Sequence, residues 1–255
     1  MQNKTLTGAA LVRDVLDNPS RIDKCYSLFH DYSILNSLAL VYQCEKRGLE
    51  VGPVASFKKW KSLGARIKKG QKALSICIPF NVKSKYLTRK VKQDDGTEKE
   101  EPVMFTAFSW KNVVFAHSQT EGGKIQEVHK CKWELSKALR NLGIKQIPFS
   151  MVNGNVQGYA NENGIALNPL GSHPIRTAVH ELAHKLMHTG KTNLDSSTKE
   201  VEAELVSYIL GLVLKLDGVE ESRGYIKHWL GSNELQEKTA MKALAVANKI
   251  YSAGR

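Results

Sequence analysis

The C-terminal half of the chain contains His180-Glu181-Leu182-Ala183-His184, and this stretch decides the fold of that half. It is an H-E-x-x-H motif inside a run of apolar residues with helical spacing. Positions i and i+4 lie on one face of a helix, so the two imidazoles can point at one metal ion while Glu181 lies beside them as a general base. The motif therefore predicts a buried helix that supplies two metal ligands.

Flanking residues predict where this helix begins and ends. Pro174 stands near the first turn, where proline fits a helix, after Ser172 or His173 as the cap. Gly190 stands where a C-terminal stop belongs.

A second helix, expected at 197–216, carries three glutamates. Glu200 and Glu204 are four residues apart on one face, and a catalytic zinc site needs a third protein ligand. We expect Glu200 to be that ligand and Glu204 to accept a hydrogen bond from a ligating imidazole, with the reverse assignment left open.

Glu202 points to another side of this helix and is expected to be solvated. His188 lies two turns beyond His180, about 12 Å along the axis, which is too far to share one ion. We therefore interpret His188 as a packing or substrate-side residue.

The expected cofactor is one Zn²⁺ ion, with Mn²⁺ or another divalent metal as the alternative. Zinc lowers the pKa of bound water and polarises a carbonyl group. Glu181 would move the proton of that water to a leaving amine, so the reaction class is peptide hydrolysis. The group that stabilises the oxyanion stays open between Tyr159, Tyr225 and His228.

Composition limits the remaining possibilities. The 255 residues suffice for one large domain or two modest ones. No run of 18 apolar residues occurs, so we expect no membrane span, and the first residues lack the apolar segment of an export signal. Four cysteines without a C-x-x-C pair are expected to be buried thiols in a reducing cytoplasm; they are Cys25, Cys44, Cys77 and Cys131.

The net charge of +12 is concentrated in one window, because no acidic residue occurs between Glu50 and Asp94. Lysines and aromatic residues alternate there, and no base-reading motif is visible. Lysines that contact phosphates and aromatics that stack on unpaired bases predict binding to the backbone of single-stranded nucleic acid. The alternative is a solvated basic face with Trp60 and Phe80 in a core. The residues expected to bind the nucleic acid are Lys58, Lys59, Trp60, Lys61, Arg66, Lys68, Lys69, Lys72 and Tyr86.

Hydrophobic periodicity and turn residues predict an α+β protein. Strand 86–92 is expected to be the neighbour of strand 73–80, with a turn at 94–97, an exposed loop to Glu101 and a linker at 120–124. The remaining expected helices are 24–47, 56–63, 130–142, 222–230 and 233–253, and the remaining expected strands are 103–108, 112–115, 147–151, 155–160 and 164–168.

Residues 57–73 resemble the N-terminal single-stranded-DNA-binding domain of ArdC-type antirestriction proteins, and 103–115 fit the same domain. The C-terminal half resembles the zincin domain of those proteins and the ImmA/IrrE-like metallopeptidases, whose motif reads H-E-x-x-H-x-x-L-H. In those families a following helix carries E-x-x-x-[END], which corresponds to Glu200 and Glu204. The resemblance implies a small α+β ssDNA-binding domain at 1–123 and a zincin-like metallopeptidase domain at 124–255, with a short antiparallel sheet beside the H-E-x-x-H helix.

The leading hypothesis is a cytoplasmic ssDNA-binding protein of a mobile element with a zinc metallopeptidase domain. Its role would be antirestriction or DNA protection, with proteolysis associated with DNA. One alternative is a protective DNA-binding protein whose metal is structural or vestigial. Another is an ImmA-like protease that cleaves a repressor independently of DNA.

Overall fold

The computed structural model describes residues 6–22, 32–92, 97–123, 132–150, 156–190, 194–231 and 233–255. The chain divides into two compact units: Met1–Pro53 together with Ile125–Arg255, here called the helical unit, and Val54–Lys124, here called the basic unit. The helical unit thus includes residues that the predicted division at 123/124 assigns to the DNA-binding domain. Compact units and homologous domains divide a chain by different criteria, and the two predicted domains stay a prediction.

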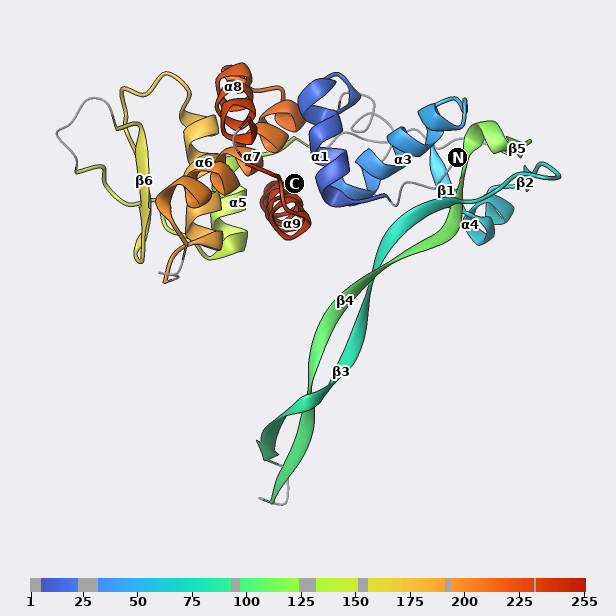
Figure 1. Cartoon of the computed structure of the whole chain (residues 1–255), viewed down its shortest axis with the longest axis horizontal. Helices are drawn as coiled ribbons and strands as arrows, with labels where there is room; N and C mark the ends of the chain where they lie inside the picture. Colours follow the sequence, from blue (N-terminus) through green and yellow to red (C-terminus); the bar gives the residue numbers. More distant parts are fainter. Residues whose placement is uncertain are drawn as a thin grey trace. The chain divides into compact units, whose positions relative to one another are not determined.

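Most of the helical unit is built from helices (Figure 1). In chain order they are α1 (Gly8–Asp17), α3 (Ile34–Lys46), α5 (Leu135–Leu142), α6 (Pro174–Met187), α7 (Ser196–Leu214), α8 (Val219–Leu230) and α9 (Glu237–Gly254). The predicted helices are confirmed within two to four residues at most ends, and α3 covers the described part of 24–47. Sequence analysis missed α1.

Helix α7 is central in this unit, because α6, α8 and α9 all pack against it. Its sequence explains this position: after the first turns it is apolar on every side, and such a helix must be buried on every side. Asp195 caps its N-terminus, where Oδ1 accepts a hydrogen bond of 2.8 Å from the Thr198 N–H. The first turns of α7, which carry the glutamates, are therefore held by the Asp195 cap on one side and by the buried remainder of the helix on the other.

Helix α6 begins at Pro174 after His173, as predicted, and ends at Met187 with His188 as the C-cap residue. One side of α6 packs on α7, and another packs on the hairpin of β6 (Gly158–Asn161) and β7 (Gly164–Leu167). The turn predicted between these strands is confirmed, since Asn161 Oδ1 accepts hydrogen bonds from the N–H groups of Asn163 and Gly164. The strand predicted at 147–151 is wrong for its described part, 147–150, because only the preceding residue, Gln146, forms an isolated bridge, to Ile165.

The basic unit is dominated by a long antiparallel hairpin, β3 (Leu74–Lys92) and β4 (Glu98–Ala116) (Figure 1). Each strand has 19 residues. The predicted pairing of 86–92 with 73–80 is wrong, because both segments belong to β3 and pair with β4. The break predicted between them is present only as a shift of the pairing register between Lys83 and Thr88. The predicted loop up to Glu101 is wrong, because Glu98–Glu101 lie within β4. The polar residues that suggested breaks are tolerated, since most side chains of this ribbon are open to solvent on both faces. The predicted turn residues 94–96 lie outside the described residues, between the paired positions Lys92 and Glu98.

Short elements close the base of this hairpin. β1 (Val54–Ser56) pairs with the end of β4, and β2 (Arg66–Ile67) pairs with β5 (Thr120–Glu121) after a single 3-10 turn at His117–Gln119. The short basic helix is confirmed as α4 (Phe57–Ser62), and Gly64 follows it with φ +77°.

Of the cysteines, Cys44 and Cys77 are buried thiols that form no disulfide, as expected, whereas Cys25 and Cys131 lie outside the described residues. Within the described part of the chain, no helix is both long and apolar enough to span a membrane.

Candidate metal centre

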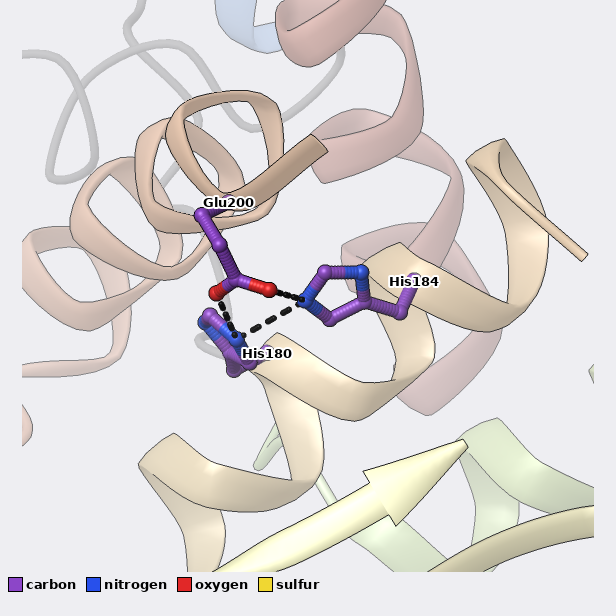
Figure 2. A group of neighbouring side chains, drawn as sticks. All are labelled: His180, His184 and Glu200. Carbon is purple, nitrogen blue, oxygen red and sulfur yellow. Dashed lines mark hydrogen bonds and ion pairs between the residues drawn. The ribbon is translucent and has the colours of Figure 1, made fainter. Parts of the chain in front are cut away.

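Three side chains from α6 and α7 converge on one point, as Figure 2 shows. The Nε2 atoms of His180 and His184 are 3.0 Å apart. Glu200 Oε2 lies 3.5 Å from His180 Nε2, and Glu200 Oε1 lies 3.4 Å from His184 Nε2. The i, i+4 spacing on α6 places both imidazoles on the side that faces α7, where the capped first turns hold the carboxylate opposite them.

These distances fit a divalent cation. Protein nitrogen and oxygen ligands lie about 2.0–2.2 Å from zinc in a tetrahedron, which puts neighbouring ligand atoms about 3.3 Å apart. The three observed separations of 3.0, 3.4 and 3.5 Å lie around that value. Among the described residues, this is the group of histidine and acidic side chains whose donor atoms lie close enough for one ion.

The remaining ring nitrogen of His180 faces a second carboxylate. Nδ1 of His180 lies 3.3 Å from Glu204 Oε1, so Glu204 contacts the far side of the ring rather than the convergence point. Burial by itself lowers the pKa of His180, but the contacts with Glu200 and Glu204 outweigh it and raise this pKa to about 9. The contacts with His180 and His184 lower the pKa of Glu200.

Glu181 is buried beside the two histidines, with 7% of its surface exposed. Burial raises the pKa of this carboxyl group, and the charges of His180 and His184 oppose the rise. A carboxylate with a raised pKa is a better proton acceptor near neutral pH than an exposed one. Strand β6 approaches it closely at Gly158, where an added Cβ would lie 3.0 Å from Glu181 Cγ.

A cavity of about 580 Å³ lies between β6, α6 and α7, and the convergence point opens into it. Residues 156–160 form one wall, and His180, Glu181 and Glu200 form another. Strand β6 pairs with β7 along one edge only; within the described residues no strand pairs with its other edge. Of the three oxyanion candidates, Tyr159 lines this cavity. Tyr225 is 43% exposed, and His228 is exposed on α8.

The prediction that Glu202 is solvated is wrong. This side chain is 5% exposed, and its Oε2 lies 2.9 Å from His188 Nε2 and also contacts Lys242 Nζ. Because α6, α8 and α9 surround α7, a residue off the metal-facing side points at another helix instead of water. His188 is likewise buried, and its Nδ1 lies 3.0 Å from His184 Nδ1. The sequence signal that could have revealed this buried contact is His188 itself, a third histidine eight residues after His180 on the same face of the helix.

In the basic unit, all but one of the side chains predicted to contact DNA are exposed. Tyr86 is 93% exposed. The exception is Trp60, which is 3% exposed and donates its indole N–H to Phe115 O at 2.8 Å. Its predicted role as a base-stacking residue does not fit this burial, so Trp60 belongs to the core. The exposed residues are Lys58, Lys59, Lys61, Arg66, Lys68, Lys69, Lys72 and Tyr86.

The far end of the hairpin carries balanced charge. Arg89 is paired in register with Glu101, and Lys90 with Glu100. Lys90 Nζ also forms an ion pair of 3.2 Å with Glu98. The excess of positive charge is therefore largest at the base of the hairpin, on α4, β2 and the loop that follows β2.

Fold and site together define an α+β protein of two compact units with an H-E-x-x-H helix as part of a candidate metal centre. Residues 16–113 match the family model of the N-terminal domain of anti-restriction factor ArdC. Over these residues the chain is similar to ArdC, which confirms the resemblance seen in its sequence.

Solved structures support the same conclusion for the fold. The metal-free crystal structure of antirestriction protein ArdC from plasmid R388 has 18% identity and a TM-score of 0.54, covering 96% of this chain and 95% of that one. The Mn(II)-bound structure of the same protein has 16% identity and a TM-score of 0.51, covering 97% of each chain. A curated relative, an uncharacterized protein of Bacillus anthracis, is 27% identical over 229 residues, which cover 72% of this chain and 39% of that protein. The chain thus spans about two fifths of the length of that relative.

Proposed function

We propose that this protein is an antirestriction protein that binds single-stranded DNA through its basic unit and hydrolyses peptide bonds at a metal centre formed by His180, His184 and Glu200. The convergence of three donor atoms at near-tetrahedral spacing, with a buried Glu181 in the same cavity, is the observation that carries the enzymatic part. The Mn(II)-bound structure of ArdC supports a divalent metal in this fold, and a donor set of two imidazoles and one carboxylate suits Zn²⁺ as well as Mn²⁺.

His180, His184 and Glu200 would hold the Zn²⁺ ion, which would lower the pKa of a bound water molecule and act as a Lewis acid toward the scissile carbonyl. Glu181 accepts a proton from the attacking water and returns it to the leaving amine. The free edge of β6 can pair with an extended peptide and hold its backbone along the wall of the cavity. Glu204 keeps the His180 ring turned so that Nε2 faces the centre.

The open geometry favours a catalytic metal over a structural one. Structural zinc sites are closed by four protein ligands, whereas here three donors border a cavity and 48% of the Glu200 side chain is exposed. A metal with only a structural role would give no reason for a buried carboxylate, Glu181, to line the cavity beside the ligands.

Substitution of Glu181 tests the enzymatic proposal. Glu181→Gln should retain the metal, as measured by elemental analysis, and lose peptide hydrolysis by about 10²–10⁴-fold because it removes the proton acceptor. Glu162→Gln, at an exposed position in the β6–β7 turn, is the matched control and should behave like the wild type. Undiminished hydrolysis by Glu181→Gln would show that another group acts as the base. Repeating the assay with added ssDNA separates DNA-associated proteolysis from DNA-independent cleavage.

The charge distribution supplies the test of DNA binding. Lys68→Ala/Lys69→Ala removes two exposed cations near the base of the hairpin, and Arg89→Ala/Lys90→Ala removes two that face acidic partners in register. Each phosphate contact with a single strand contributes about 0.7 to the slope of log affinity against log salt concentration. The first variant should therefore lower this slope by about 1.4 in fluorescence anisotropy titrations, and the second should change it little. Equal effects of the two variants would argue against a site at the base of the hairpin.

A further inference from the structure

The three histidines of α6 form a continuous chain with two residues from other helices. His180 Nε2 lies 3.0 Å from His184 Nε2, and His184 Nδ1 lies 3.0 Å from His188 Nδ1. His188 Nε2 in turn lies 2.9 Å from Glu202 Oε2 on α7, and the same oxygen accepts a hydrogen bond from Lys242 on α9. The outer part of this chain is buried, since the side chains of His188 and Glu202 are each 5% exposed.

For a neutral His188, hydrogen-bonding rules allow one direction through this chain. The ionised carboxylate of Glu202 only accepts, and Lys242 only donates, so His188 must donate from Nε2. A neutral His188 then has a lone pair on Nδ1, and His184 must donate from its own Nδ1. His184 Nε2 is thereby left with a lone pair, and this is the atom that faces the candidate metal centre.

We infer that His188, Glu202 and Lys242 form a positioning relay that locks His184 in the Nδ1–H tautomer and so presents Nε2 as a metal ligand. This inference rests on the metal-binding part of the proposed function. Buried partners of this kind fix the ring orientation and tautomer of a ligating imidazole. Lys242 balances the charge of the Glu202 carboxylate, so the pair can be buried next to a neutral imidazole.

The two ligand histidines therefore have different supports. His180 faces the carboxylate of Glu204 directly, on the side of α7 that also carries Glu200. Behind the His184 ring, the group in contact with Nδ1 is the imidazole of His188, one helical turn further on. Behind the His180 ring, the group in the same place is a carboxylate. His184 is therefore supported through His188. Loss of the relay should therefore disturb His184 while leaving the contact of His180 with Glu204 in place.

Two substitutions at position 188 separate the relay from simple packing. His188→Phe keeps an aromatic ring but removes the acceptor for His184 Nδ1. His188→Gln restores an acceptor and a donor in one amide group. His228→Phe is the matched control, because His228 is an exposed histidine on α8. Circular dichroism establishes that each variant is folded.

The first readout is the tautomer of His184 in the metal-free protein, from long-range ¹H–¹⁵N correlation spectra of the imidazole rings. The wild type, His188→Gln and His228→Phe should show the Nδ1–H form, whereas His188→Phe should show a mixture or the Nε2–H form. The second readout is Zn²⁺ affinity by competition with a chromophoric chelator. His188→Phe should lose about 10–100-fold, and His188→Gln should recover most of this loss.

A folded His188→Phe protein with wild-type tautomer and wild-type Zn²⁺ affinity would overturn the relay. If His188→Phe does not fold, Glu202→Gln decides the question. Lys242 only donates and so should keep the amide oxygen, which leaves the amide nitrogen to donate to His188 Nε2 and reverses the chain, so that His184 should take the Nε2–H tautomer. An unchanged His184 tautomer in Glu202→Gln would likewise overturn the relay. A wild-type protein that binds no Zn²⁺ would instead refute the proposed function, while the tautomer of His184 would still report on the relay.

Discussion

At Gly158 the wall of the cavity comes very close to the helix that carries Glu181. A Cβ added there would lie 2.8 Å from Thr177 Cγ2, 2.9 Å from Ala166 O and 3.0 Å from Glu181 Cγ. Ordinary contacts of a Cβ begin near 3.4 Å, so Gly158→Ala must move β6 from α6 by about half an ångström, and the Ala166 carbonyl cannot yield alone because it belongs to the backbone of β7. Overpacking of this kind costs about 1–3 kcal/mol of stability.

For a chain of this size, each kcal/mol corresponds to about 2–4 °C in Tm, so Gly158→Ala should lower Tm by about 2–12 °C. Gly224→Ala is the matched control, because Gly224 lies within α8 with no atom within 4 Å of the added Cβ. Alanine is the better helix former there and should raise stability by about 0.5–1 kcal/mol. Both variants are measured by calorimetry with and without Zn²⁺, together with peptide hydrolysis, which Gly158→Ala should reduce because the wall beside Glu181 moves. A Gly158→Ala protein as stable and as active as the wild type would refute the close approach of β6 to Glu181.

Two further predictions concern the charge state of the centre and the core of the basic unit. The pKa of His180 is raised to about 9, so a proton must leave this ring when a metal binds below that pH. Metal affinity should then rise with pH by up to about tenfold per unit below pH 9, with proton release seen by calorimetry in buffers of different ionisation enthalpy; a flat profile would contradict the assignment of His180. In the metal-free protein the sign is opposite, because a raised pKa stabilises the fold fully below the unfolded value of about 6.5 and this contribution is lost as pH rises through about 9. Trp60→Phe removes the hydrogen bond to Phe115 O and should lower stability by about 0.5–1.5 kcal/mol while leaving ssDNA affinity nearly unchanged. A selective loss of affinity at full stability would instead return Trp60 to the DNA-binding surface.

Local spacing predicted what lies within one helix or one turn. The i, i+4 pair of His180 and His184 fixes a shared face whatever surrounds it, and the turn at Asn161–Gly164 follows from residues that favour it. The continuity of β3 and β4 could not be predicted in the same way. Asn81, Lys83, Ser84 and Lys85 predict a break only if a strand must bury one of its faces, and the ribbon of β3 and β4 is exposed on both faces instead.

Long-range packing decided the fates of the three glutamates of α7. Glu200, Glu202 and Glu204 are alternate residues of one short segment, and nothing in their local sequence distinguishes a ligand from a buried ion-pair partner. Glu202 is buried because Lys242, 40 residues further along the chain, reaches the same oxygen as His188. Without that ammonium group, a carboxylate at 5% exposure would carry an unbalanced charge in a low-dielectric interior. The burial of Glu202 therefore depends on how α9 packs on α7. Because of this packing, the face of α7 that carries Glu202 can support His184, while the face that carries Glu200 meets the candidate metal centre.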